Sequence, residues 1–150
     1  QADEQSAGYP LGEGYKLTSQ SGDLRGQEIL PEHLASVEQG DILLMTSCYE
    51  GLQQPWLSAS TATWLIEDRQ IRMLGLQATG VQWQYALKAE APANSPIRRM
   101  LLGANVPIAH PLVNIDTLQQ GRVFYFGMPL RTPKMEASFI RAMALEAPDA

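Results

Sequence analysis

The sequence predicts an α+β fold, namely a mostly antiparallel β-sheet with a C-terminal helix and one or two short helices packed on it. Three observations lead to this prediction: residues 62–74 have the pattern of a β-hairpin, residues 81–87 alternate apolar and polar side chains, and residues 132–145 carry apolar side chains at helical spacing. The length of 150 residues is typical of one domain. We therefore expect a flexible leader at residues 1–8 and a single globular domain at residues 9–150.

The first third of the chain predicts loops, one short helix and one buried strand. Residues 8–26 are rich in glycine, which favours turns over a long helix. Pro31 at the first turn and Gly40 as a stop signal predict a short helix between them. The apolar run at residues 42–47 follows directly and has the length of a buried strand.

The middle of the chain predicts antiparallel strands. Residues 63–66 and 70–74 flank the polar tip formed by residues 67–69, as in a tight hairpin. Val81, Trp83, Tyr85 and Leu87 then share one face of a strand, and glutamines occupy much of the other. Because parallel sheets are covered on both faces, this alternation favours an antiparallel sheet with one wet side.

The last third predicts two helices separated by strands. Ser95 is suited to cap a helix that begins at Pro96 and stops at Gly103. An edge strand at residues 112–115 and a last strand at residues 123–126 follow. The C-terminal helix is predicted to begin at Thr132-Pro133 and to bury one apolar face, which comprises Met135, Phe139, Ala142 and Met143.

Composition excludes several classes of protein. No apolar run approaches the ~18 residues that cross a bilayer. The net charge is −5, and the first 50 residues hold nine acidic side chains against two basic ones, which disfavours nucleic acid as a partner and suits a basic protein surface. One cysteine and two histidines allow no disulfide framework and give no metal-binding motif, so no cofactor and no metal are predicted.

Two constellations could carry catalysis. Cys48 follows the strand predicted at residues 42–47, and a nucleophile and base pair would require His33 or His110 to reach it in space. Glu67 and Asp68 are adjacent acids, but neighbouring residues of a strand point to opposite faces. The simpler interpretations are a small buried cysteine and a solvated hairpin tip, so no catalytic residue is predicted.

A protein-binding surface is predicted from loop residues that combine acids, amides and aromatic rings. Trp56 follows a loop and is suited either to cover the core or to anchor a partner. The predicted set is Tyr49, Glu50, Gln53, Gln54, Trp56, Glu67 and Asp68.

These features favour a non-enzymatic, exported protein-binding domain. The leading hypothesis is an inhibitor of the immunity-protein kind in the bacterial envelope, which occludes the active site of a toxic or lytic enzyme. The partner is expected to be a protein with a basic binding groove. The alternatives are an accessory lipoprotein of an envelope assembly or secretion machine and a small cysteine-dependent hydrolase. Because numbering opens at Gln1 without Met, we expect a periplasmic or outer-membrane-anchored protein, with any membrane tether limited to an N-terminal acyl group. The partner's identity and the oligomeric state stay open.

Overall fold

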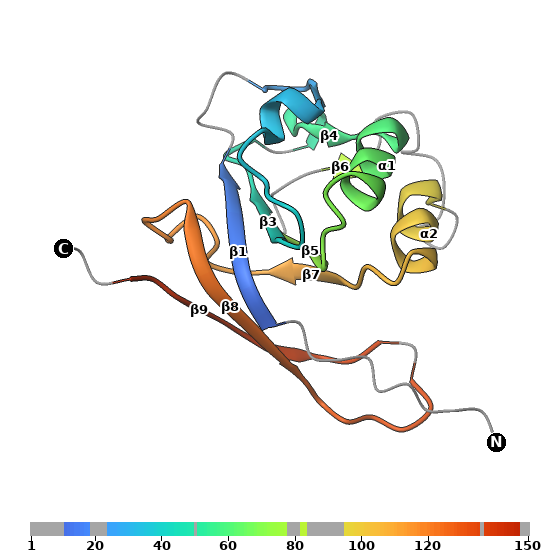
Figure 1. Cartoon of the computed structure of the whole chain (residues 1–150), viewed down its shortest axis with the longest axis vertical. Coiled ribbons are helices and arrows are strands. Elements are labelled where there is room, and N and C mark those ends of the chain that lie inside the picture. The colour runs from blue at the N-terminus through green and yellow to red at the C-terminus, as the bar shows by residue number, and fades with distance from the viewer. Residues whose placement is uncertain are drawn as a thin grey trace.

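A computed structural model describes residues 11–18, 24–49, 51–77, 82–83, 95–135 and 137–147, and the structural statements below refer to these residues. They form an α+β structure with two sheets and two α-helices (Figure 1). The helices are α1 (Ala59–Glu67) and α2 (Pro96–Gly103), with short 3₁₀ turns at Pro31–Leu34 and Gly51–Gln53. The strands are β1 (Leu11–Thr18), β2 (Glu28–Ile29), β3 (Ile42–Thr46), β4 (Trp56–Leu57), β5 (Met73–Gln77), β6 (Gln82–Trp83), β7 (Ile108–Leu112), β8 (Arg122–Pro129) and β9 (Ile140–Leu145). No described helix is long and apolar enough to span a membrane.

The main sheet is mixed and mostly parallel. Its order is β7-β5-β3-β1-β8-β9, and the pairs β7·β5, β5·β3 and β3·β1 are all parallel. Strand β8 runs antiparallel to both of its neighbours, β1 and β9. A second sheet, β2-β4-β6, is parallel throughout. The predicted antiparallel sheet is therefore wrong.

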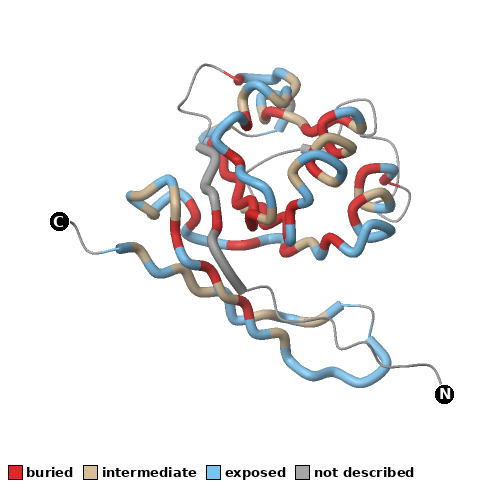
Figure 2. The backbone as a smooth tube through the Cα atoms, viewed as in Figure 1, coloured by how far each residue is buried: buried red, intermediate tan, exposed pale blue. Residues whose placement is uncertain are grey.

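The main sheet is buried on both faces along its central strands (Figure 2). Leu43 of β3 and Leu74 of β5 face the helical layer, where they join Leu65 of α1 and Leu101 of α2 in one apolar cluster. Ile42 alternates with Leu43 and belongs to a second cluster on the opposite face. Double-sided burial explains why residues 42–46 are an unbroken apolar run, which confirms the strand predicted there.

The predicted β-hairpin at residues 62–74 is instead helix α1 followed by strand β5. The Ser58 hydroxyl accepts the backbone N–H of Thr61 and so caps the helix, while Thr61, Ala62 and Leu65 provide its buried face. The aromatic and β-branched side chains at residues 63–66 favour a strand only weakly, and packing of this face overrides that preference. Glu67 and Asp68 therefore end a helix rather than tip a hairpin.

The predicted C-terminal helix is also wrong, because residues 140–145 form strand β9. Ile140, Ala142 and Ala144 alternate with three other residues, and each pairs with an inward-facing position of β8. The supposed helical face does not exist, since Met135 and Phe139 are 68% and 86% exposed.

Helix α2 confirms its prediction. The Ser95 hydroxyl accepts the backbone N–H of Arg98, Pro96 occupies the first turn, and the helix ends at Gly103. The predicted short helix after Pro31 is limited to one 3₁₀ turn, after which Gly40 adopts a φ of +82°. Of the alternating segment predicted at residues 81–87, only β6 lies within the described residues, and it pairs in parallel with β4.

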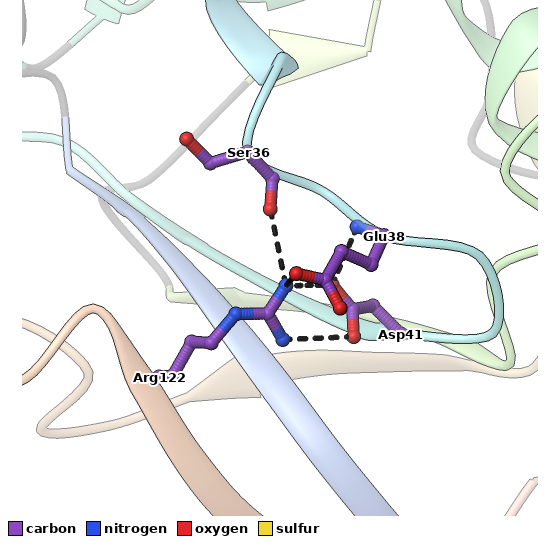
Figure 3. A network of polar contacts seen from close by, with 4 residues as sticks. All are labelled: Ser36, Glu38, Asp41 and Arg122. Carbon is purple, nitrogen blue, oxygen red and sulfur yellow. Dashed lines mark hydrogen bonds and ion pairs between the residues drawn. The ribbon is translucent and has the colours of Figure 1, made fainter.

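A charged cluster fastens β8 to the loop that precedes β3 (Figure 3). Arg122 at the start of β8 donates two hydrogen bonds to the carboxylate of Asp41 and a third to the backbone oxygen of Ser36. Its guanidinium also lies 3.1 Å from Glu38. Since β1 lies between β3 and β8 in the sheet, this cluster closes one end of the sheet across an intervening strand.

Candidate functional site

A cavity of about 450 Å³ lies beside the β8–β9 hairpin. Its lining comes from most of residues 111–118, from residues 140–144, and from Leu44 and Tyr125. This volume is within the range of small-molecule sites, roughly 300–1,000 Å³. Among the described residues, this cavity is the candidate functional site.

Small side chains on the inner face of the hairpin leave this space open. Tyr125 and Gly127 of β8 pair with Ala144 and Ala142 of β9, so a single aromatic ring is surrounded by residues with little or no side chain. A Cβ atom at Gly127 would lie 2.8 Å from the Tyr125 hydroxyl oxygen, so a larger residue there would force the Tyr125 side chain to shift.

The opposite wall is the loop that follows β7. Gln77 at the carboxyl end of β5 accepts the backbone N–H of Asp116 at 3.1 Å and holds this loop against the sheet. Within the loop, the Thr117 hydroxyl donates to the backbone oxygen of Asn114 at 2.8 Å. Leu112 and Ile115 are buried, so the wall is mainly apolar.

Tyr125 is the unusual group in this cavity. The residue is 2% exposed, and its hydroxyl makes no hydrogen bond to any described residue. Burial raises the pKa of the Tyr125 phenol to about 12, so the group is neutral and keeps its proton at physiological pH. A buried donor without an acceptor costs about 1–3 kcal/mol, which a ligand oxygen bonded to it would offset.

The sequence-predicted binding residues lie towards the two ends of helix α1. Gln53, Gln54 and Trp56 lie before α1, whereas Glu67 and Asp68 lie at its far end, about 13 Å along the helix axis. Trp56 is partly buried in β4, Tyr49 is partly buried after β3, and Glu50 lies outside the described residues. Binding of a protein partner by these residues stays a prediction.

The structure does not support His110 as the base of the Cys48 pair that was weighed from the sequence, although no catalytic residue was predicted. Cys48 is exposed just beyond β3, whereas His110 lies in β7, and β5 separates these two strands. His33 lies in a 3₁₀ turn, where its Nδ1 atom accepts the Leu30 backbone N–H at 2.9 Å.

A resident metal does not fit the described residues. They contain no group of three His, Cys, Asp or Glu side chains placed to hold an ion. Arg98 and burial lower the pKa of His110, so this histidine faces a positive charge that would also repel a metal cation.

From the sequence, residues 123–126 are predicted only as a last strand, and Tyr125 is not singled out as a cavity residue. A usable signal was present. Residues 123–129 are almost uninterruptedly apolar, whereas a surface hairpin alternates, and Gly127, Ala142 and Ala144 place small residues on one face of the pairing.

Comparison with solved structures shows that the fold is shared with known proteins. The chain is similar to a potential metal-dependent hydrolase with cyclase activity, with 20% identity and a TM-score of 0.61 over 89% of this chain and 64% of that one. It is also similar to isatin hydrolase A from Ralstonia solanacearum, with 16% identity and a TM-score of 0.63 over 91% of this chain and 60% of that one. The chain thus spans somewhat less than two thirds of either protein. No family model and no curated protein sequence matches it.

These likenesses establish a shared fold and correct the functional hypothesis. Both solved structures are hydrolases by name, which contradicts the interpretation as a non-enzymatic inhibitor of the immunity-protein kind. They give no support to the accessory-lipoprotein alternative either. Export of the protein stays a prediction.

Proposed function

We propose that this chain is a hydrolase domain that acts on a small organic compound with a carbonyl group, of the amide or cyclic amide class. The observation that carries the proposal is the fold shared over about nine tenths of the chain with two proteins named as hydrolases. In the reaction, water adds to the carbonyl carbon, the carbon–nitrogen bond breaks, and a proton passes to the leaving nitrogen.

The cavity beside Tyr125 is the proposed substrate site. Its lining combines aliphatic side chains with the polar residues Asn114, Thr117 and Arg141, which suits a compact molecule that carries polar groups such as a carbonyl. With its side chain turned into the cavity, the neutral Tyr125 hydroxyl would donate to the substrate carbonyl oxygen and stabilise the negative charge that develops there as water adds.

The described lining supplies no general base. It contains no Asp, Glu, His or Cys side chain, so Tyr125 would bind and polarise the substrate without activating the water. In this proposal, Tyr125 therefore acts as an oxyanion donor and does not abstract a proton.

The experiment is a turnover assay of the purified chain with isatin and with open-chain anilides, each with and without added Mn²⁺ or Zn²⁺. We expect hydrolysis above the buffer rate. Tyr125→Phe should lower the turnover number by about 100-fold, as loss of one oxyanion donor does. Tyr49→Phe removes a hydroxyl outside the cavity and should leave the rate unchanged. A folded wild-type chain that turns over none of these compounds under any condition would contradict the proposal.

A further inference from the structure

The cavity beside Tyr125 has one charged residue in its described lining, and that residue is a cation. Arg141 of β9 lines the cavity, whereas no acidic side chain does, and Asp116 in the opposite loop is not a lining residue. Arg141 is exposed and, within the described part of the chain, it takes part in no ion pair. Because a guanidinium stays charged at any physiological pH, the cavity carries a positive charge without an acidic side chain of its own to neutralise it.

Arg141 reaches the cavity because β9 is an edge strand. β9 is the last strand of the main sheet and pairs on its other side with no described strand (Figure 1). All five residues 140–144 line the cavity. Since consecutive residues of a strand point to opposite faces, this continuous lining indicates that the cavity opens along the free edge of β9, where side chains from either face reach it. Arg141 therefore lies at the mouth of the cavity.

The Tyr125 hydroxyl is the second donor of the cavity, and it lies near Arg141 along the hairpin. A Cβ atom on Gly127 would be 2.8 Å from this hydroxyl, so the phenol extends to the level of Gly127. Gly127 pairs with Ala142, the neighbour of Arg141. One step along a strand is ~3.4 Å and one strand spacing is ~4.8 Å, so one small molecule can contact both donors.

We propose that the substrate of this cavity is an amide that also carries a carboxylate group, with its carbonyl oxygen on the Tyr125 hydroxyl and its carboxylate on Arg141 at the mouth. This inference rests on the proposed hydrolase function and names the substrate class. A lining with one neutral donor, one cation and no anion complements a ligand with one neutral and one anionic acceptor. A guanidinium also matches a carboxylate through two parallel hydrogen bonds. Arg141 thus selects the substrate and takes no part in the addition of water.

Isothermal titration calorimetry with matched probes tests the proposal without requiring turnover. The probes are the ring isomers of acetamidobenzoate, which carry an amide carbonyl and a carboxylate, and the corresponding acetamidobenzamides, in which a neutral amide replaces the carboxylate. We expect wild type to bind at least one acetamidobenzoate about 10-fold more tightly than its matched amide, because only the carboxylate forms a charge-assisted pair.

Variants of Arg141 locate the source of this preference. Arg141→Met removes the charge and keeps an unbranched aliphatic chain, so the preference should disappear while the dissociation constant of the neutral amide stays unchanged. Arg141→Lys should retain part of the preference, since it keeps the charge and loses the paired hydrogen bonds. The matched control is Arg131→Met, an exposed position in the loop of the same hairpin that does not line the cavity, and it should retain the full preference. Thermal melts check that each variant is folded.

Several results would overturn the inference. They are a folded wild type that binds neither probe, equal binding of acid and amide by wild type, a preference that survives in Arg141→Met, and an equal loss of preference in Arg131→Met. The proposed reaction fails separately. A carboxylate preference that depends on Arg141 without hydrolysis of any amide would contradict the hydrolase function alone, whereas hydrolysis of amides without this preference would overturn the substrate class alone.

Discussion

The guanidinium of Arg122 holds the carboxylate of Asp41 through two hydrogen bonds, from Nη1 to Oδ1 at 3.1 Å and from Nη2 to Oδ2 at 3.0 Å. The two residues are 81 positions apart in sequence. Asp41 is 4% exposed, and its Oδ2 atom also accepts the backbone N–H of Glu38 at 2.8 Å. This bidentate ion pair therefore links two parts of the chain that are distant in sequence, and one of its partners, Asp41, is largely desolvated.

Removal of the arginine should destabilise the fold. Arg122→Ala leaves the buried Asp41 carboxylate without its cation, so we expect the free energy of unfolding to fall by about 2–3 kcal/mol. Urea denaturation measures this loss. Arg131→Ala, at an exposed loop position, is the control and should change stability by less than about 0.5 kcal/mol. Equal effects of the two variants would show that the pair contributes nothing.

Gly75 is required where the side chains of β3 and β7 meet. A Cβ atom there would lie 2.7 Å from Leu44 Cδ2 and 2.8 Å from Leu112 Cδ1. Gly75→Ala should therefore cost about 1–3 kcal/mol through overpacking and push two lining residues into the cavity. Gly103→Ala has no neighbour within 4 Å and should be neutral or slightly stabilising. Chemical denaturation of both variants gives the comparison, and a neutral Gly75→Ala would contradict it.

Phe139 contributes little to stability. At 86% exposure it has little apolar contact to lose, so Phe139→Ala should change the free energy of unfolding by less than about 0.5 kcal/mol. A docked C-terminal helix would instead require a loss of about 3–5 kcal/mol. Leu65→Ala, at a fully buried position of α1, is the positive control and should cost about 2–5 kcal/mol.

Tyr125 should make the fold sensitive to alkali. Its pKa is raised from 10.0 to about 12, so between these values the folded chain retains a proton that the unfolded chain releases. The contribution of Tyr125 to the free energy of unfolding is fully present below pH 10 and is lost as the pH rises towards 12. Tyr125→Phe should flatten the decline in melting temperature over this window, whereas Tyr49→Phe should retain it. If the melting temperatures of wild type and Tyr125→Phe fall in parallel over this pH window, the alkaline loss of stability does not come from Tyr125.

His110 should make the stability of the fold depend on pH in the acidic range. Burial and the nearby Arg98 lower its pKa below 6.5, so the unfolded chain binds a proton at a pH where the folded chain resists it. Stability is therefore lost as the pH falls below 6.5. His110→Gln should reduce that loss relative to wild type in melts between pH 7 and pH 5. An unchanged slope in His110→Gln would contradict the prediction.

The elements that could be predicted from the sequence are those with signals inside their own few residues. Helix α2 depends on Ser95 and Pro96 at one end and Gly103 at the other, and strand β3 depends on an uninterrupted apolar run. Helix α1 was missed because Trp64 and Ile66 favour a strand, whereas the deciding contacts are the Ser58 cap and the burial of Leu65 against distant residues.

Strand direction and the cavity depend on long-range pairing, which no local window contains. The alternation at Trp83 cannot distinguish a parallel partner from an antiparallel one, and in the structure its strand pairs in parallel with β4. The cavity is lined by Leu44, Tyr125 and residues 140–144, three parts of the chain that only the sheet order brings together. Their individual chemistry was visible in the sequence, but their proximity was not.

The position of β1 has a consequence for biosynthesis. This strand is made first, yet it lies in the interior of the sheet, and Leu11 pairs with Phe126. During translation β1 can pair with β3 early, but its other edge has to wait until more than 100 further residues have left the ribosome. Such high contact order slows folding, because loop-closure entropy is lost before the strand pairing offsets it. The nascent chain therefore exposes one edge of β1 until β8 has left the ribosome, and chaperone demand should peak in that interval.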